Sequence, residues 1–412
     1  MTIFQVIALL VTLTALFSYV NFRFIKLPPT IGVMLITLVV SLGLIGIGHF
    51  NPAVHRAATD WLKGIDFNRA LMQGMLSFLL FAGALHINLN ELFEEKGVVA
   101  VLAVGGVILS TLFFGSMMYC VLGWLGLKLS FAWCLLFGAL ISPTDPVAVI
   151  GILKNAKAPR PLEVQIAGES LFNDGVGVVA FLVCSEITAD AGELSAGRIS
   201  MLLLQEAVGG AVFGFVAGYI TYRLLRSVDH YQVEALLTLA LVTGGYALAS
   251  ALHLSGPIAI VVAGLLIGNH GRALAMSQTT REHLDTLWEL IDEALNGILF
   301  VLIGLEILVL TFTPQLLLGG LIAIPVVLLA RWMSVGIPIV LMKRWHSFSP
   351  GTVTIMSWGG LRGGISVALA LSLPTGPERT TILVITYVIV VFSILVQGLT
   401  IGRVVRNAVR SA

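Results

Sequence analysis

The sequence predicts an all-α polytopic membrane protein, and three observations lead to that prediction. The 412 residues are 58% hydrophobic and only 11% charged, whereas water-soluble domains carry about a quarter charged residues. The apolar residues gather in runs long enough to span a bilayer core about 30 Å thick. Two of these runs are interrupted by proline or glycine clusters, as in the broken helices of transporters.

Counting the apolar runs gives about 13 transmembrane helices. The predicted spans cover residues 3–20, 29–48, 70–87, 98–124, 130–152, 162–188, 201–226, 233–252, 255–269, 284–310, 315–342, 351–373 and 380–402. No positive residue precedes the first run, so we predict no signal peptide. Residues 51–69 are too polar to span and are expected at the membrane interface. The sequence ends about ten residues after the last span, so we expect no regulatory cytosolic domain.

Lysine and arginine residues set the predicted orientation. With the N-terminus outside, the cytoplasmic segments contain fifteen of the 23 Lys and Arg residues, and the outer segments contain six. Cytoplasmic loops of membrane proteins carry an excess of positive residues. We therefore predict an outside N-terminus, a cytoplasmic C-terminus and an odd number of helices. The net charge of +1 and the lack of a basic cluster give no indication of a nucleic-acid partner.

The fifth and twelfth predicted helices contain breaks. In the fifth, Pro143 and Pro146 remove backbone donors and disrupt the hydrogen-bond ladder. In the twelfth, residues 359–364 (GGLRGG) are too rich in glycine to hold a regular helix. The breaks lie seven helices apart, and because seven is odd the two segments run in opposite directions. This pattern predicts two inverted six-helix repeats whose broken helices 5 and 12 cross near the midplane, where transporters bind their substrates.

The sixth predicted helix contains a polar stretch, residues 169–174 (ESLFND), inside an apolar run. Four-residue spacing places Glu169 beside Asn173 and Ser170 beside Asp174 on one helix stripe. A charge at mid-membrane depth costs roughly 3 kcal/mol even on a lenient scale, so such carboxylates usually carry function. The alternative is that both carboxylates only form structural ion pairs with arginines. We predict that the stripe binds the transported ion.

Five ionisable side chains lie deep in the predicted spans: Asp145, Glu169, Asp174, Arg331 and Arg362. Unpaired, they would cost on the order of 15 kcal/mol, so they must be paired, hydrated or neutralised by a proton. When all are ionised, the set carries three negative and two positive charges. One proton or one monovalent cation would bring its net charge to zero. The count predicts one-for-one exchange that moves no net charge.

Asp174 is the candidate carrier, because a carboxylate oxygen suits an alkali cation and can also take up a proton. Ser170 and Thr144 offer hydroxyl oxygens as further Na⁺ ligands, so a Na⁺ site is predicted at these three residues. Asn173 and Asp145 complete the predicted ion-binding residues. Asn173 can donate hydrogen bonds to hold a neighbouring loop but cannot take the proton.

The other deep charges are expected to have structural roles that transport requires. Asp145 and Arg362 lie in the two breaks, where they can neutralise the partial charges of the half-helix ends. Arg331, midway along the eleventh helix, is expected to pair with Glu169.

An acidic cluster lies near the inner end of the tenth predicted helix. Glu289, Asp292 and Glu293 share a face through three- and four-residue spacing. They are a candidate inner funnel that concentrates cations or senses pH. An equally good interpretation is a solvated helix start, with acids at its favourable N-terminal end.

Other classes of function and cofactor receive less support from the residues. A cation channel would need a repeated pore-loop filter, and an intramembrane hydrolase would need a base near a nucleophile such as Ser170. The cysteines Cys120, Cys134 and Cys184 lie in apolar runs without metal-ligand spacing, so we expect core residues and no metal cofactor.

Four motifs, in order, resemble the monovalent cation:proton antiporter-1 family, which includes the NhaP-type sodium/proton antiporters and the eukaryotic sodium/hydrogen exchangers. They are residues 142–147, the ESLFND stretch at 169–174, the VVAGLLIGN run at 261–269 and the GGLRGG stretch at 359–364. The resemblance covers nearly the whole chain. It implies a thirteen-helix homodimer in a lipid bilayer, in which a core domain moves against a dimerisation domain in elevator-like alternating access.

The resemblance also implies a division of the chain and of its site. Residues 1–97 and 189–310 would form the dimerisation domain with the connector helix, and residues 98–188 and 311–412 the core ion-translocation domain. The implied roles are Asp174 as ion and proton carrier, Ser170 and Thr144 as co-ligands, Asn173 as the partner of Asp174, Asp145 and Arg362 at the crossing, and Glu169 paired with Arg331.

The implied function is antiport of Na⁺, or of Li⁺ or K⁺, against H⁺, with cation and proton competing for Asp174 and with no cofactor. In this family Asn before Asp goes with electroneutral exchange, whereas two consecutive aspartates mark electrogenic relatives. The alternative is a K⁺/H⁺ antiporter of the same fold, because selectivity depends on cavity size and ligand number. The cytosolic tail of the eukaryotic exchangers is missing, which favours a prokaryotic inner-membrane protein.

Overall fold

The computed structural model describes residues 2–51, 70–155, 158–189 and 204–410, together with the isolated positions 53, 59, 62, 67, 197 and 201. This part of the chain is helical, and its one β pairing is an isolated bridge between two residues. The all-α prediction is therefore confirmed. Most of the stretch 51–69, which was expected at the membrane interface, lies outside the described residues.

Nine helical stretches of the described chain are long and apolar enough to cross a membrane, and each coincides with a predicted span. They contain α1 (Ile3–Val20), α2 (Pro29–Phe50), α8 (Gly106–Trp124), α11 (Arg160–Ala189), α13 (Gly210–Leu225), α14 (Tyr231–Ala251), α15 (Gly256–Leu266), α18 (Pro314–Met342) and α21 (Pro377–Phe392). Helices form here because no water is available in a bilayer core to satisfy backbone polar groups outside a helix.

Two further predicted spans are broken where the prolines and glycines predicted a break. The fifth consists of α9 (Phe131–Ile141) and α10 (Val147–Asn155), and the twelfth consists of α19 (Thr352–Trp358) and α20 (Gly364–Leu371). Each half is too short to cross a bilayer alone. Each break leaves about five residues of backbone outside a helix at the centre of its span.

The remaining two spans differ in length and composition. The third is a short helix, α5 (Leu76–Leu85), preceded by a π-helical segment at Ala70–Met75. The tenth is α17, which runs from Gln278 to Glu306 and so begins earlier than the predicted residue 284. Its first half carries several charged residues, so composition alone does not identify it as a span.

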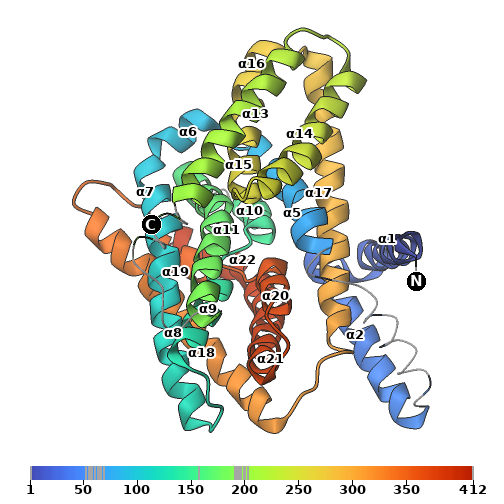
Figure 1. The fold of residues 1–412 in the computed structure, drawn as a ribbon, viewed down its shortest axis with the longest axis vertical. Helices are drawn as coiled ribbons and strands as arrows, with labels where there is room; N and C mark the ends of the chain where they lie inside the picture. The colour runs from blue at the N-terminus through green and yellow to red at the C-terminus, as the bar shows by residue number, and fades with distance from the viewer. Residues whose placement is uncertain are drawn as a thin grey trace.

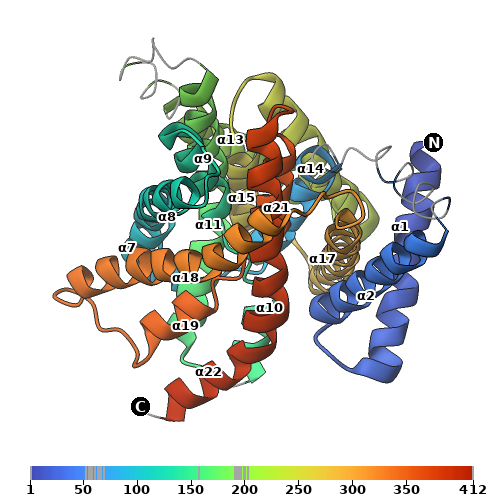
Figure 2. The same ribbon diagram turned by 90° about the horizontal axis from the view of Figure 1, so that it is seen from below.

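The helices are arranged on two sides of the broken pair (Figures 1 and 2). In both views α1 and α2 lie beside α17 at one edge, while α8 and α18 lie at the opposite edge. Helices α13, α14 and α15 pack together, and α15 also packs against α5. Helix α22 (Gly398–Arg410) continues the last span and packs against α10 and α19.

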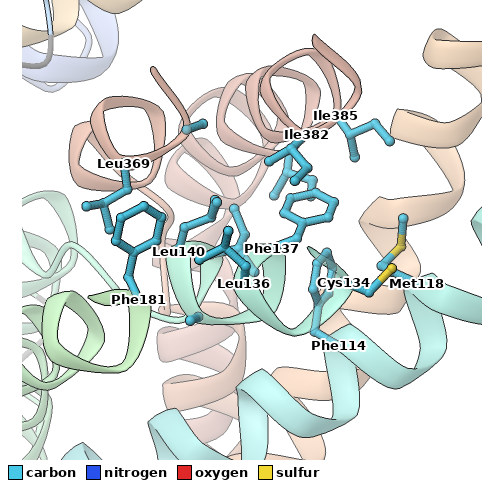
Figure 3. Close-up of a cluster of buried hydrophobic side chains, with 14 of the residues drawn as sticks. Phe114, Met118, Cys134, Leu136, Phe137, Leu140, Phe181, Leu369, Ile382 and Ile385 are labelled. Carbon is cyan, nitrogen blue, oxygen red and sulfur yellow. The ribbon is translucent and has the colours of Figure 1, made fainter. Parts of the chain in front are cut away.

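A buried apolar cluster holds the broken helices in place (Figure 3). Phe137 of α9 meets Phe114 of α8 edge to face, with ring centroids 4.9 Å apart. On the other side of α9 the cluster includes Leu369 of α20 and Ile382 of α21. The cluster therefore joins a half of each broken helix to intact helices. Cys134 and Cys184 belong to it, but Cys120 is exposed on α8, so its expected place in the core is wrong.

Candidate functional site

The two breaks cross and hydrogen-bond to each other. The Asp145 N–H donates to the Leu361 carbonyl at 2.8 Å, and the two residues form an antiparallel bridge. Extended backbone inside a membrane protein must find partners that a helix would otherwise supply. Here each broken helix supplies a partner to the other, and the antiparallel sense agrees with helices that run in opposite directions.

Arg362 lies against the C-terminal end of α9. Its Nη1 donates to the carbonyl oxygens of Ser142 and Pro143 at 2.5 and 3.1 Å, and the residue is 2% exposed. Its backbone N–H donates to Ser393 Oγ at 2.8 Å. A helix C-terminus carries partial negative charge, which a buried guanidinium neutralises.

Asp145 lies at the opposite kind of helix end. Only Pro146 separates Asp145 from the first residue of α10. A Cβ built on Gly363 would lie 3.0 Å from Asp145 Oδ2. The carboxylate is therefore next to the backbone that begins α20. Helix N-termini carry partial positive charge, which suits a carboxylate. The structure thus brings both residues to the crossing. Asp145 lies at helix N-termini, which carry partial positive charge, and Arg362 lies at a helix C-terminus, which carries partial negative charge.

Glu169 and Arg331 form the expected ion pair. Two parallel bonds join them, Nη1 to Oε1 at 2.5 Å and Nη2 to Oε2 at 2.8 Å, and both side chains are almost fully buried. Arg331 also donates to the Met356 carbonyl through Nε at 3.4 Å and Nη2 at 3.3 Å. Met356 lies near the C-terminal end of α19. Arg331 therefore neutralises the partial negative charge of that helix end, as Arg362 does for α9. That second contact was not predicted.

Asn173 fastens the first break to α11. Its Nδ2 donates to Thr144 Oγ1 at 2.8 Å, and the Thr144 N–H donates to its Oδ1 at 3.3 Å. Nδ2 also approaches Glu169 Oε1 at 3.5 Å. The family resemblance implied Asp174 as the partner of Asn173, but these hydrogen bonds go to Thr144 and Glu169. Thr144 Oγ1 and Ser170 Oγ are 3.2 Å apart and share a further bond.

Asp174, Ser170, Thr144 and Asp145 line one cavity of about 530 Å³. Thr144 and Ser170 are 1% and 3% exposed, whereas Asp174 is half-buried. The polar stripe of α11 is therefore divided in two. Glu169 and Asn173 bond to buried partners, while Ser170 and Asp174 present carboxylate and hydroxyl oxygens to the cavity. Oxygen ligands of this kind suit hard cations.

Helix α17 forms part of the facing wall of this cavity. Glu289 and Asp292 line it, but Glu293 is exposed and is absent from the lining. The predicted three-acid cluster is therefore split. Asn296 also lines the cavity and was not predicted, although its four-residue spacing from Asp292 places both on one face.

Ion pairs that were not predicted lie at the mouth of the cavity. Arg160, at the start of α11, bonds Glu91 of α6 (Leu89–Glu94) and Glu163 at 2.9 Å each. All three residues line the cavity, and the Arg160 side chain is 57% exposed. The cavity thus extends from Asp174 to the surface. Glu91 and Arg160 are far apart in the chain, so only the fold reveals this pairing.

Comparisons with known proteins point to one family. The pattern of the family described as "Sodium/hydrogen exchanger, transmembrane" matches residues 9–407. The Na⁺/H⁺ antiporter NhaP of Pseudomonas aeruginosa is 49% identical, over 98% of this chain and 96% of its own. The Na⁺/H⁺ antiporter NhaH of Halobacillus aidingensis is 32% identical, over 93% of each chain.

A solved structure has the same fold. It is that of the sodium proton antiporter MjNhaP1 from Methanocaldococcus jannaschii at pH 8, which superimposes with a TM-score of 0.74 over 98% of both chains. The two sequences are 20% identical, so the likeness concerns the fold alone.

Proposed function

The chain belongs to the sodium/hydrogen exchanger family, an integral-membrane transporter family, and on that premise we propose that it exchanges Na⁺ for H⁺. One observation carries the proposal beyond the relatives' names: Asp174, Ser170 and Thr144 converge on one cavity beside the crossing of two broken helices. We propose these three residues as the Na⁺ ligands and Asp174 as the group that takes up the proton.

The charge balance of the site supports one-for-one exchange. Glu169 is paired with Arg331, and Arg362 is bound by the carbonyls that end α9. Of the five deep ionisable side chains, Asp145 and Asp174 line the cavity. With Asp145 beside the helix N-termini, Asp174 is left to take up either one cation or one proton. We propose that this competition couples the two fluxes and makes the cycle electroneutral.

We propose that the cavity opens to the cytoplasm. It reaches Glu91 and Arg160, both in segments that the Lys and Arg distribution assigns to the cytoplasmic side, and Glu289, near the inner end of the tenth predicted helix. Glu289 is exposed and lies about three turns into α17, where it lines the cavity, so it is proposed to attract cations as part of an inner funnel. Glu293 has no such position, because it lies outside the lining.

We propose an elevator-like cycle in a homodimer. Residues 98–188 and 311–412 would move as the core, and residues 1–97 and 189–310 would stay as the dimerisation domain. The proposal is supported by where the site lies: its ligands come from α11 and the first break, while the facing wall of the cavity includes α17. Sliding the core along that wall would carry Asp174 from one side of the membrane to the other.

Proteoliposomes test the exchange and its stoichiometry. Purified protein is reconstituted with an internal pH dye, an acid-inside gradient is imposed, and Na⁺, Li⁺ or K⁺ is added in turn. We expect Na⁺ to dissipate the gradient at a rate that a valinomycin–K⁺ clamp leaves unchanged. A rate that follows the imposed potential would contradict electroneutrality, and a response to K⁺ alone would favour the K⁺/H⁺ alternative. Unitary currents in a planar bilayer would indicate a channel.

Asp174→Asn is expected to abolish exchange in the same assay, because an amide cannot take up the proton. The variant should stay folded, since Asp174 is half-buried at the cavity wall. Size-exclusion chromatography of both proteins is the control for folding. Exchange retained in a folded Asp174→Asn protein would remove Asp174 from the central role.

A further inference from the structure

A second polar group faces the cavity from helices α17 and α20. Asp292 and Asn296 lie one turn apart on the cavity face of α17, and Ser366 lies on the first turn of α20. The two helices touch here, because a Cβ on Gly364 would collide with the side chain of Leu299. Three oxygen-bearing side chains are thus brought to one part of the wall.

One member of this group is buried without a partner for its polar atom. Ser366 is 1% exposed and Asn296 is 4% exposed, and both line the cavity. Ser366 Oγ has no hydrogen-bond partner among the described residues, whereas the Asn296 amide hydrogen-bonds to Asp292. Leaving such a hydroxyl unsatisfied costs about 1–3 kcal/mol, so a buried group of this kind calls for an explanation. A ligand in the cavity provides one.

The charge around the group identifies the class of ligand. Asp292 and Asp145 line the same cavity, so their like charges repel each other, and the neighbouring Asn296 amide hydrogen-bonds to Asp292. A cation held near Asp292 would relieve that repulsion. Carboxylate, amide and hydroxyl oxygens are hard ligands, and the set has the same character as Asp174, Ser170 and Thr144.

We propose that Asp292, Asn296 and Ser366 form a second, transient cation position, which takes up Na⁺ from the cytoplasmic mouth and passes it to Asp174. This inference rests on the proposed function, because it supplies a step within the same transport cycle. It differs from a funnel, which acts through charge alone and needs no neutral ligand. A partly dehydrated ion would exchange water for the oxygens of this group before it reaches Asp174.

Transport kinetics in proteoliposomes test the second position. Asp292→Asn and Ser366→Ala should raise the KM for Na⁺ while kcat stays within about twofold. For Ser366→Ala we expect about a fivefold rise, the size that loss of one uncharged contact predicts. Glu293→Gln is the matched control, because it removes the same charge one residue along α17 but outside the cavity lining. It should leave KM and kcat unchanged.

Ionic strength separates a ligand from a funnel. The series is repeated with choline chloride, which screens long-range attraction but leaves direct contacts. The KM increases of both variants should persist. The proposal is overturned if the effect of Asp292→Asn disappears at high ionic strength and Ser366→Ala has the KM of the unmodified protein.

A binding measurement covers the case in which a variant does not transport. In an Asp174→Asn background, Na⁺ should still raise the thermal unfolding temperature relative to choline, and addition of Asp292→Asn should remove that rise. A rise that survives the double substitution would overturn the second position. This arm needs no transport, so it is independent of whether the unmodified protein exchanges Na⁺ for H⁺. Failure of the unmodified protein in the exchange assay would contradict the proposed function instead.

Discussion

At the residue scale, neighbouring polar side chains of one helix stripe have different tasks. Glu169 and Ser170 are adjacent in sequence, yet one is held by a guanidinium and the other faces the cavity. Paired and cavity-facing groups have different requirements. A buried ion pair orders the helix, whereas the groups at the cavity must exchange ligands during transport. The bidentate geometry of Glu169 and Arg331 fits the ordering role.

Glu169→Gln is expected to lower stability more than cation affinity. It leaves Arg331 buried with an uncompensated charge, which costs about 3–5 kcal/mol. The thermal unfolding temperature of the purified protein, measured with and without Na⁺, checks this expectation. Glu91→Gln is the control, because its pair with Arg160 is largely exposed and should contribute less than about 1 kcal/mol. A normal unfolding temperature with lost Na⁺ stabilisation would reverse the assignment.

At the element scale, the broken helices depend on close packing against their neighbours. A Cβ on Gly138 of α9 would lie 3.0 Å from the Thr111 Cα of α8 and closer still to its carbonyl oxygen. Small residues allow membrane helices to approach in this way. The position of α9 therefore depends on the lack of a side chain at residue 138, and the first break follows only four residues later.

Gly138→Ala is expected to destabilise the protein by about 1–3 kcal/mol, the usual cost of overpacking. It should also slow exchange, because α9 carries the break that presents Thr144. Gly123→Ala in α8 is the matched control, since a Cβ there meets nothing within 4 Å. Thermal unfolding and exchange rate of the two variants are compared with the unmodified protein. Equal unfolding temperatures and exchange rates for all three proteins would show that the α8–α9 contact can accommodate a methyl group.

In both broken helices, an arginine side chain binds carbonyl oxygens at the C-terminal end of the first half. Arg362 binds the last carbonyls of α9, and Arg331 binds a carbonyl near the end of α19. Negative helix ends in a low-dielectric core are costly without such partners. A role at the half-helix ends was expected of Arg362, whereas Arg331, which was expected to pair with Glu169, also stabilises the backbone of the crossing.

At the scale of the whole molecule, the distribution of positive residues predicts which way the cavity faces. A C-terminal green fluorescent protein fusion should fluoresce, and a C-terminal alkaline phosphatase fusion should be inactive, because both report a cytoplasmic C-terminus. A phosphatase fused after Lys128, in the loop between α8 and α9, should be active. The opposite pattern would place the mouth at Arg160 on the outer side and contradict the proposed inward-facing cavity.

Local features of the sequence account for the helices and their interruptions. Among the described residues, every predicted span contains helix, and the breaks lie at Pro143–Pro146 and at the glycine run of the twelfth span. These features are local, because apolar length, proline and glycine act on their own segment. The cost of burying a charge in a membrane also identifies Glu169, Asp174 and Arg331 as candidate site residues from the sequence, without any distance.

Which polar groups contact each other depends on how the helices pack. Helical periodicity placed Asp292 and Glu293 on one broad face, but the packing of α17 turns one to the cavity and leaves the other exposed. The contact of Arg331 with α19 and the place of Ser366 depend equally on how distant segments pack. Spacing along a helix fixes directions within that helix, whereas contacts between helices depend on their relative rotation and depth, which follow from the packing of the whole bundle.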